Sequence, residues 1–275
     1  MALSAIDIYK QLLPKTNCKE CGYLTCLAFA SMVVSEKYPL NKCPYIDPLK
    51  IEAAQSELEE QYSEGKWTKR DMAADALAWA KERAASMEIS SLPERIGGRL
   101  IKIADIETLE LPYFKDLIYI NNNTITHANG KKLNRWEQVF IFNHMAQGGL
   151  KEPTGNWKGF QEFPNTVSKI KSMKEHVEIP LIKHFRGNKQ KLLDAGISIG
   201  GQIYKEKDVN ADVSLIFRPL PKVPVILNFW DEDIKDNFEA AVKLLFDETI
   251  VEHLDIESIM FLSERIKQML SNEEY

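Results

Sequence analysis

The sequence predicts an α+β fold in two parts, a small helical domain followed by a larger α+β domain. Three observations predict it. All four cysteines fall within the first 43 of the 275 residues. Apolar residues recur at helical spacing through the N-terminal part. Beyond about residue 97, strand-like and helical segments lie in blocks, without the strict βαβ alternation that a parallel sheet requires.

The N-terminal part is predicted to consist of helices that a loop joins. Residues 2–13 carry apolar side chains at helical spacing, and Pro14 ends that helix. Residues 15–23 contain two cysteines and a glycine, which favours a loop, and residues 24–37 are predicted as a second helix. An acidic, weakly amphipathic helix is predicted for residues 48–64.

The larger part is predicted to mix helices with short strands. Asn129-Gly130 is typical of a hairpin turn, and Gly148-Gly149 is typical of the end of a helix. The predicted helices are residues 71–87, 135–147, 175–186, 189–195 and 256–270. The predicted strands are residues 113–120, 124–126, 213–217, 223–230 and 241–246.

Domain boundaries are predicted where the sequence becomes polar after the last cysteine. Residues 1–47 form the predicted cysteine domain, residues 48–70 a helical linker, and residues 71–275 the larger α+β domain.

Composition excludes several classes of protein. The chain is 44% hydrophobic and 27% charged, as expected of a chain with a sizeable core. A net charge of −5 disfavours a general nucleic-acid binder. No apolar run is long enough to span a bilayer, and Asp7 and Lys10 interrupt the first apolar stretch, which disfavours a secretory signal. We expect no nucleic-acid or membrane partner and a cytoplasmic location; the oligomeric state stays open.

The cysteines follow the spacing C-x2-C-x4-C-x16-C, and Pro44 follows the last of them. A cubane iron–sulfur cluster needs four thiolates that converge on one compact object, and three close ligands with a fourth further away satisfy this need. The pattern therefore predicts one [4Fe–4S] cluster, which is both the cofactor and the metal site. The predicted ligands are Cys18, Cys21, Cys26 and Cys43.

Neighbouring residue types suit such a cluster. Gly22 allows a tight backbone turn, and Cys26 lies near the start of a predicted helix, whose free N–H groups stabilise anionic sulfur. Hydrogen bonds to sulfur are expected from Thr16, Asn17 and Thr25. Apolar side chains are expected to keep water off one face, namely Leu24, Leu27, Phe29 and Tyr45.

Other readings of the four cysteines remain open. Zinc takes the same donors in structural sites, although such sites usually present two separated cysteine pairs. Disulfides or free thiols are a further alternative, disfavoured because the cysteines are gathered at one end of the chain. The bunching of three cysteines with one distant cysteine favours the cluster.

The N-terminal segment DIYKQLLPKTNCKECGYLTCLAFASMVVSEKYPLNKCPY, residues 7–45, resembles the [4Fe–4S] domain of the large subunit of the corrinoid iron–sulfur protein, in the carbon monoxide dehydrogenase/acetyl-CoA synthase system. The shared pieces are LLPKTNC, C-x2-C-G, TCLAFA and KCPY. The resemblance implies that the four matching cysteines ligate the cluster and that it passes single electrons to a corrinoid. The rest of the chain does not resemble the corrinoid-binding barrel of that family.

From about Trp79 onward the chain resembles a second family, an uncharacterised domain often found behind such iron–sulfur modules in anaerobes. The matching pieces are LPYF at residues 111–114, GNWKGFQEF at 155–163 and RPLPKVPVILNFW at 218–230. This resemblance implies no activity.

Candidate sites in the larger domain are weak, and catalytic residues stay unknown. His144 is a candidate axial ligand for a metal or cofactor, although a buried structural histidine is the more common case. An acidic turn is a candidate cation site, and an aromatic loop a candidate pocket for a planar ligand; a surface turn and a loop anchored to the core are favoured instead. The turn holds Asp231, Asp233 and Asp236, and the loop holds Trp157, Phe160 and Phe163.

Three functions are consistent with these observations. The favoured one is an electron-transfer or accessory protein that passes one electron to a partner protein or a corrinoid-type cofactor, for reductive activation in corrinoid or carbon monoxide metabolism. The second is an enzyme whose C-terminal site the cluster feeds. The third is an interaction module with a structural four-cysteine metal site.

Overall fold

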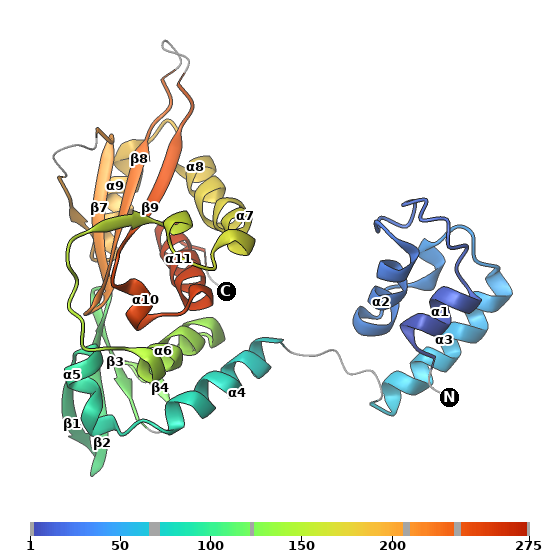
Figure 1. Ribbon diagram of the computed structural model, residues 1–275, viewed down its shortest axis with the longest axis horizontal. Helices are drawn as coiled ribbons and strands as arrows, with labels where there is room; N and C mark the ends of the chain where they lie inside the picture. The colour runs from blue at the N-terminus through green and yellow to red at the C-terminus, as the bar shows by residue number, and fades with distance from the viewer. Residues whose placement is uncertain (1–2, 66–71, 122–123, 206–209, 234–237, 274–275) are drawn as a thin grey trace. The chain divides into compact units, whose positions relative to one another are not determined.

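The computed structural model describes residues 3–65, 72–121, 124–205, 210–233 and 238–273, and the chain divides into two units between Met72 and Ala73 (Figure 1). The secondary structure is mixed helix and strand, so the predicted α+β class is confirmed, with a helical N-terminal unit and a larger α+β unit. Among the described helices, none combines the length and apolar character needed to cross a membrane.

In its described residues, the N-terminal unit consists of three α-helices with side-chain caps at their first turns. They are α1 (Ala5–Gln11), α2 (Cys26–Glu36) and α3 (Pro48–Ser63), with a short 3-10 helix, η1 (Leu40–Lys42), between the last two. Ser4, Thr25 and Asp47 each accept a hydrogen bond from a backbone N–H of the helix that follows. These caps satisfy orphan donors at each helix start, which is why the helices begin where they do.

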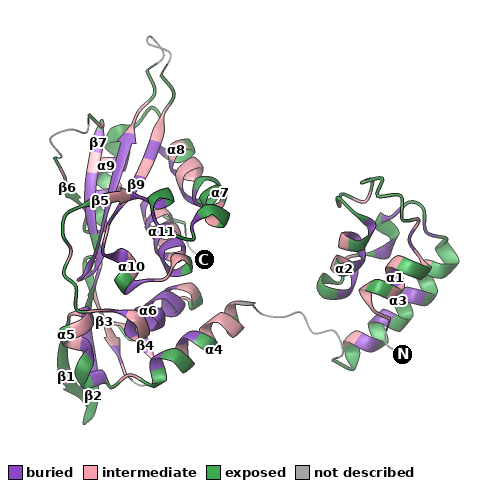
Figure 2. Ribbon diagram, in the orientation of Figure 1, coloured by how far each residue is buried: buried purple, intermediate pink, exposed green. Residues whose placement is uncertain are grey.

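The core of this unit lies between the three helices, where their inner faces are buried (Figure 2). Ile8, Phe29 and Leu40 are almost completely buried. The helix α3, which lies in the segment predicted as a linker, contributes Leu58 to this core, and the Tyr62 hydroxyl donates to the carbonyl of Val33 at 2.5 Å. Residues 66–70 of that predicted linker lie outside the described residues.

The C-terminal unit contains two antiparallel sheets and eight α-helices within the described residues. The first sheet has the order β1-β2-β3-β4, and the second the order β5-β9-β8-β7-β6. The strands are β1 (Arg99–Ile103), β2 (Ile106–Tyr113), β3 (Asp116–Ile120), β4 (Ile125–His127), β5 (Trp157–Gly159), β6 (Gln202–Ile203), β7 (Val213–Leu220), β8 (Val223–Trp230) and β9 (Ala241–Asp247). The helices are α4 (Met72–Ala85), α5 (Leu92–Ile96), α6 (Arg135–Gln147), α7 (Ile170–Met173), α8 (Ile179–Phe185), α9 (Lys189–Ser198), α10 (Ile250–His253) and α11 (Ile256–Ser271).

The strand β8 is the centre of the second sheet and is buried along nearly its whole length (Figure 2). Its apolar run from Val223 to Leu227 explains most of this burial, because alternating polar residues would face solvent on one side. The one polar residue of the strand, Asn228, is buried and accepts a hydrogen bond from the Ser214 hydroxyl at 2.6 Å. On the helical side, α8 contacts β9, α9 contacts β7, and α11 contacts both of these helices and α6. One continuous hydrophobic core therefore joins the sheets and helices of this unit.

The prediction of a single strand over residues 113–120 was wrong. The strand β2 ends at Tyr113, the chain turns at Phe114 and Lys115, and β3 begins at Asp116. Phe114 adopts a left-handed φ of +53°, and its N–H donates to the carbonyl of Pro219 at 3.1 Å. That bond comes from a bulge in β7, so a distant strand rather than local sequence stabilises this turn.

Gly98 precedes β1 at a point where the backbone leaves no room for a side chain. Its φ is +85°, and a Cβ atom there would lie 2.5 Å from the carbonyl oxygen of Glu110 on β2. Gly130 has a similar φ of +79°, but a Cβ atom there would meet nothing within 4 Å. The two glycines therefore share a conformation and differ in their surroundings.

We expect Gly98→Ala to destabilise the C-terminal unit more than Gly130→Ala does. The left-handed conformation alone costs about 1–2 kcal/mol in either variant, and the overlap with Glu110 should raise the loss at Gly98 to roughly 2–4 kcal/mol. Urea unfolding of both variants measures the difference. Equal losses of free energy in the two variants would contradict this account of the β1–β2 approach.

Candidate metal centre

The four cysteines lie on three different parts of the N-terminal unit. Cys18 and Cys21 lie in the loop between α1 and α2, Cys26 is the first residue of α2, and Cys43 directly follows η1. Cys18 is exposed and Cys21 half-buried, whereas Cys26 and Cys43 are buried in the core of the unit. The set therefore extends from the core of the unit to its surface.

The loop that carries the first two cysteines has an unusual backbone. Lys15, Asn17 and Lys19 have left-handed φ values of +63°, +52° and +68°, and Gly22 has a φ of +86°. The expected conformational role of Gly22 is thus confirmed. Left-handed residues alternating with ordinary ones turn successive N–H groups toward one side, and such concave arrangements bind anions, including iron–sulfur clusters.

Asn17 and Thr25 hold this loop against the start of α2. The N–H of Cys26 donates to Oδ1 of Asn17 at 2.8 Å, and the N–H of Ala28 donates to Oγ1 of Thr25 at 3.1 Å. The sequence predicts that these two side chains donate to sulfur, whereas the described hydrogen bonds have their oxygens as acceptors. Their observed role is to fix the loop and the helix relative to each other.

The thiols lie close enough to affect one another electrostatically. Burial raises the pKa of the Cys43 thiol, the backbone N–H of Tyr45 opposes this by donating to the sulfur, and Cys21, Cys18 and Cys26 raise the pKa further. Because Pro44 has no N–H, Tyr45 supplies the first amide after Cys43 that can reach its sulfur.

Among the described residues, no three cysteine, histidine or acidic side chains form a group that could hold one metal ion.

The apolar residues near the cysteines are only partly as predicted. Phe29 is buried and packs with Tyr23 and Tyr38, with ring centroids 5.3–6.0 Å apart in this group. Leu24 and Leu27 are exposed to 75% and 46%. These two exposed side chains, which lie on either side of Cys26 in the sequence, form an apolar rim on the surface.

Tyr45 is also exposed, to 55%, contrary to its predicted role as a cover. Its hydroxyl donates to Oε1 of Glu20 at 2.6 Å, and this hydrogen bond raises the pKa of Tyr45. Because Glu20 lies between the first two cysteines and Tyr45 follows the last, the bond ties the two ends of the cysteine region together.

The aromatic loop of the larger domain is attached to the core, as favoured over a ligand pocket. Phe160 and Phe163 are buried, and both pack on Phe246 with ring centroids 6.4 Å away. Trp157 is half-buried and donates through Nε1 to the Tyr204 hydroxyl at 3.1 Å.

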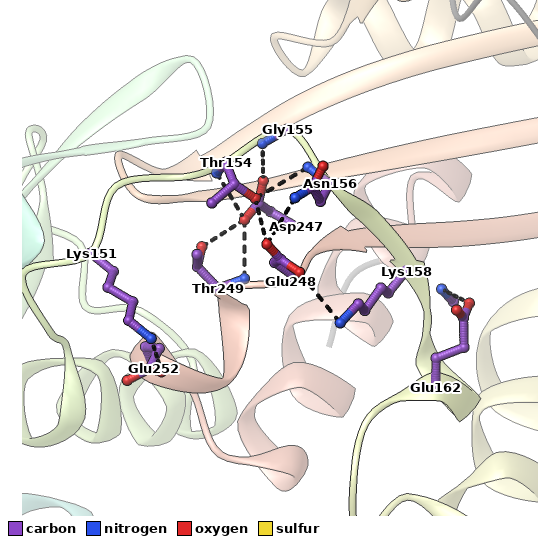
Figure 3. A network of polar contacts seen from close by, with 11 residues as sticks. Lys151, Thr154, Gly155, Asn156, Lys158, Glu162, Asp247, Glu248, Thr249 and Glu252 are labelled. Atoms are coloured by element: carbon purple, nitrogen blue, oxygen red, sulfur yellow. Dashed lines mark hydrogen bonds and ion pairs between the residues drawn. The ribbon is translucent and has the colours of Figure 1, made fainter.

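Asp247 anchors the start of this loop from the end of β9 (Figure 3). Its buried carboxylate accepts from the N–H groups of Thr154 and Gly155, and from both the N–H and the hydroxyl of Thr249. Burial disfavours the charged carboxylate, but the hydroxyl and amides that donate to it outweigh burial and lower the pKa of Asp247. The contacts make this carboxylate a structural group.

The acidic turn after β8 has structural contacts. Asp231 accepts from the N–H groups of Gly187 and Glu232 at 2.6 and 2.9 Å. Asp233 forms a β-bridge with Phe238, and Asp236 lies outside the described residues. Nothing in these contacts brings acidic oxygens together for a cation.

His144 is completely buried beside His253, which the sequence analysis did not single out. The ring centroids are 5.7 Å apart; Nδ1 of His144 lies 3.0 Å from the carbonyl of His253, and Nε2 of His253 lies 2.9 Å from the carbonyl of Lys151. Burial lowers the pKa of His144 to about 3 and also lowers the pKa of His253. Both rings are therefore neutral, and each donates to a carbonyl.

The helical unit carries all four cysteines, and family matches identify it as an iron–sulfur domain followed by a second domain. Residues 13–45 match the family described as "Putative Fe-S cluster", and residues 88–269 match the family described as "Domain of unknown function (DUF3786)". The protein belongs to the DUF3786 family, whose match covers more than half of the chain. Both resemblances predicted from the sequence are confirmed.

Curated relatives come from acetyl-CoA and corrinoid systems. The chain is 53% identical over 53 residues to the corrinoid/iron-sulfur protein large subunit of Moorella thermoacetica, over 19% of this chain and 12% of the relative. It is 50% identical over 50 residues to the acetyl-CoA decarbonylase/synthase complex subunit gamma of Methanocaldococcus jannaschii, over 18% of this chain and 10% of the relative.

A longer match is to the acetyl-CoA decarbonylase/synthase complex subunit gamma 2 of Methanosarcina thermophila. It is 30% identical over 148 residues, which are 53% of this chain and 27% of the relative. The chain thus spans only about a tenth to a quarter of the length of these relatives. No solved structure matches it.

We expect the C-terminal unit to lose stability as the pH falls below about 6.5, the pKa of a histidine in an unfolded chain. The pKa values of His144 and His253 are lowered by folding, so at mildly acidic pH the unfolded chain binds protons that the folded chain does not. Each histidine contributes a slope of up to about 1.4 kcal/mol per pH unit between its unfolded and folded pKa values. Urea unfolding at several pH values should show that His144→Asn reduces this slope, whereas the exposed His176→Asn control leaves it unchanged.

We expect Asp247→Asn to destabilise the C-terminal unit by roughly 2–4 kcal/mol at neutral pH, because an amide cannot accept from all four donors. The pKa of Asp247 is lowered by folding, so its contribution is present above about pH 4, the unfolded pKa, and disappears as the pH falls through the folded value. The difference between wild type and variant should therefore shrink in acid. The exposed Asp116→Asn variant is the matched control, and a loss there as large as in Asp247→Asn would refute the assignment.

Proposed function

We propose that this protein carries one [4Fe–4S] cluster on Cys18, Cys21, Cys26 and Cys43 and transfers single electrons to a partner. The observation that carries the proposal is the loop from Lys15 to Gly22. Three of its non-glycine residues are left-handed, a backbone type found in anion-binding concavities, and the hydrogen bond from the N–H of Cys26 to Asn17 holds the loop beside the first turn of α2. A loop of this kind beside a helix start suits an anionic iron–sulfur cluster with cysteine ligands.

The chemistry of the donors supports the cluster. The four thiols come from a loop, a helix start and the residue after η1, and they lie within electrostatic reach of one another. The N–H of Tyr45 donates to the sulfur of Cys43, and hydrogen bonds of this kind are a lever on the potential of an iron–sulfur centre. When bound, the cluster supplies reversible one-electron chemistry.

The surface near the cysteines supports exchange with a partner. Cys18 is exposed, and Leu24 and Leu27 lie exposed beside the cysteine positions. Electron-transfer encounters use small, weakly binding surfaces, and an apolar rim around a reachable centre fits such an encounter. Two of the proposed ligands, Cys26 and Cys43, are buried, whereas Cys18, Leu24 and Leu27 are exposed where a partner can contact them.

The names of the relatives favour a role in corrinoid or carbon monoxide metabolism. The relatives include a corrinoid/iron-sulfur protein subunit and gamma subunits of acetyl-CoA decarbonylase/synthase complexes. We place this chain in the same metabolism, as an accessory protein that delivers an electron to a protein partner or a corrinoid-type cofactor for reductive activation.

We expect anaerobically purified protein to contain about four iron and four sulfide ions per chain and to show a reversible electron paramagnetic resonance signal on reduction. Each single variant, Cys18→Ser, Cys21→Ser, Cys26→Ser and Cys43→Ser, should lose most of this iron, because each removes one ligand. Metal binding also contributes folding free energy to so small a unit, so the variants should unfold more readily.

Ser31→Ala is the matched control, because it removes one exposed heteroatom from α2, five residues after Cys26. It should keep full iron and an unchanged signal. Zinc without iron in oxygen-free material would instead select a structural metal site. Full iron in all four cysteine variants would reject the ligand assignment.

A further inference from the structure

A cavity of about 620 Å³ lies in the C-terminal unit, far from the cysteines in sequence. The β2–β3 turn, the end of β4, the start of α6, the end of α9 and the last turns of α11 all contribute to its lining. Its volume is within the range of small-molecule sites. The polar residues that matter for its chemistry are Lys115, His127, Lys131, Lys132, Arg265 and Gln268.

The lining carries an excess of positive charge. Four cationic side chains face two carboxylates, those of Glu137 and Glu273. The carboxylate of Glu273 is paired with Lys267, which does not line the cavity, at 2.6 Å. Lys131 and Lys132 are exposed, and within the described parts of the chain neither side chain has an ion pair. An anion in the cavity would therefore find uncompensated cations.

Arg265 is fixed in the wall by buried partners. Its Nε lies 2.7 Å from Oε1 of Glu137, whose side chain is only 4% exposed. The N–H does not point at this oxygen, so the contact is an ion pair and not a hydrogen bond. The Tyr113 hydroxyl donates to the same oxygen at 2.8 Å. A guanidinium held in this way is preorganised for a carboxylate or phosphate, because little side-chain entropy remains to be lost.

Lys115, another residue of the lining, is positioned by close backbone packing. Its Nζ donates to the carbonyl of Ser198 at 2.6 Å. Gly200 has a φ of +97°, and a Cβ atom there would lie 3.0 Å from the Cβ of Lys115, so the end of α9 and the β2–β3 turn approach each other closely. A neighbouring hollow of about 590 Å³ shares Lys115, His127 and Lys131, so the basic surface continues beyond the cavity.

Gln268 is the observation that points to a ligand. It is 8% exposed and lines the cavity, and its Oε1 is buried without a hydrogen-bond partner. An unsatisfied buried polar atom typically destabilises a fold by about 1–3 kcal/mol, and such atoms are rare in native proteins. The oxygen is closed off from the cavity as the side chain stands, so a bound molecule with its own hydrogen-bond donor would satisfy it after the Gln268 amide rotates toward the cavity.

We propose that this cavity binds a small organic anion that carries a carboxylate or phosphate group together with a hydroxyl or amine. Arg265, Lys131 and Lys132 bind the anionic group, and Gln268 accepts from the donor group. The site is independent of the cluster and goes beyond the proposed electron transfer, so either can fail without the other.

The experiment uses the full anaerobic protein with two probes of matched size, malate for the carboxylate and glycerol phosphate for the phosphate. Isothermal titration at constant ionic strength should give saturable binding of at least one probe. Hydrogen exchange should slow in residues 127–134 and 265–273 on binding. Lys131→Ala/Lys132→Ala should weaken binding by about tenfold, since each lysine contributes a fraction of the electrostatic attraction. The arm that binds more tightly identifies the anionic group.

The matched control is Lys102→Ala/Lys183→Ala, which removes the same charge from exposed positions outside the lining. It should bind the probe as wild type does. Gln268→Leu separates a ligand contact from a structural role: it should weaken binding about tenfold while leaving the unfolding midpoint unchanged or raised, because an unpartnered amide is removed. No saturable binding of either probe, equal weakening in the control, or full binding in Gln268→Leu would overturn the proposal.

Discussion

The cysteine site depends on one constraint, the fixed backbone of the loop before α2. Three non-glycine residues, Lys15, Asn17 and Lys19, adopt the left-handed conformation, and each such residue costs roughly 1–2 kcal/mol. The hydrogen bond from the N–H of Cys26 to Asn17 holds the strained loop against the helix. Asparagine adopts this conformation readily, but lysine gains nothing from a positive φ, so local side-chain preferences do not account for Lys15 and Lys19. Binding of one anionic object by the N–H groups of the loop would account for this backbone.

The same constraint explains why the first unit needs all of its helices. Cys26 and Cys43 belong to the hydrophobic core as well as to the candidate ligand set, so their positions follow from helix packing. The helix α3 closes this core through Leu58 and the bond from Tyr62 to Val33. A unit of this size has little core with which to offset a strained loop. Metal binding that stabilises the strained cysteine loop would therefore also stabilise the folded unit.

Local sequence signals predicted the elements that local interactions stabilise. The helices α2 and α6 lie within the residues predicted as helical, and the structure shows local caps at both, Thr25 for α2 and Asn134 with Glu137 for α6. The turn at Phe114 was not predictable, because a carbonyl in β7 stabilises a conformation that phenylalanine rarely adopts. The cysteine spacing predicted the candidate ligands but not the exposure of Leu24 and Leu27, which depends on how the loop is oriented on the unit.

The basic cavity could not be found from sequence because its wall is assembled from residues more than 150 positions apart, and each of these residues has an ordinary local role. Glu137 illustrates the point: Oε2 accepts from the N–H of Asn134 and completes the helix cap, while Oε1 faces Tyr113 and Arg265.

A buried ion pair, such as that of Glu137 and Arg265, gives a fold little net stability compared with apolar packing. Gln268 contributes even less to the stability of the fold, because its buried side-chain oxygen has no hydrogen-bond partner. Stability alone would favour leucine at residue 268 and an apolar pair in place of Glu137 and Arg265. Proteins depart from such preferences chiefly where they bind something. A ligand that brings both a negative charge and a donor compensates the unbalanced cations and the unpartnered amide at once, so the unfavourable features of this wall become favourable only when the cavity is occupied.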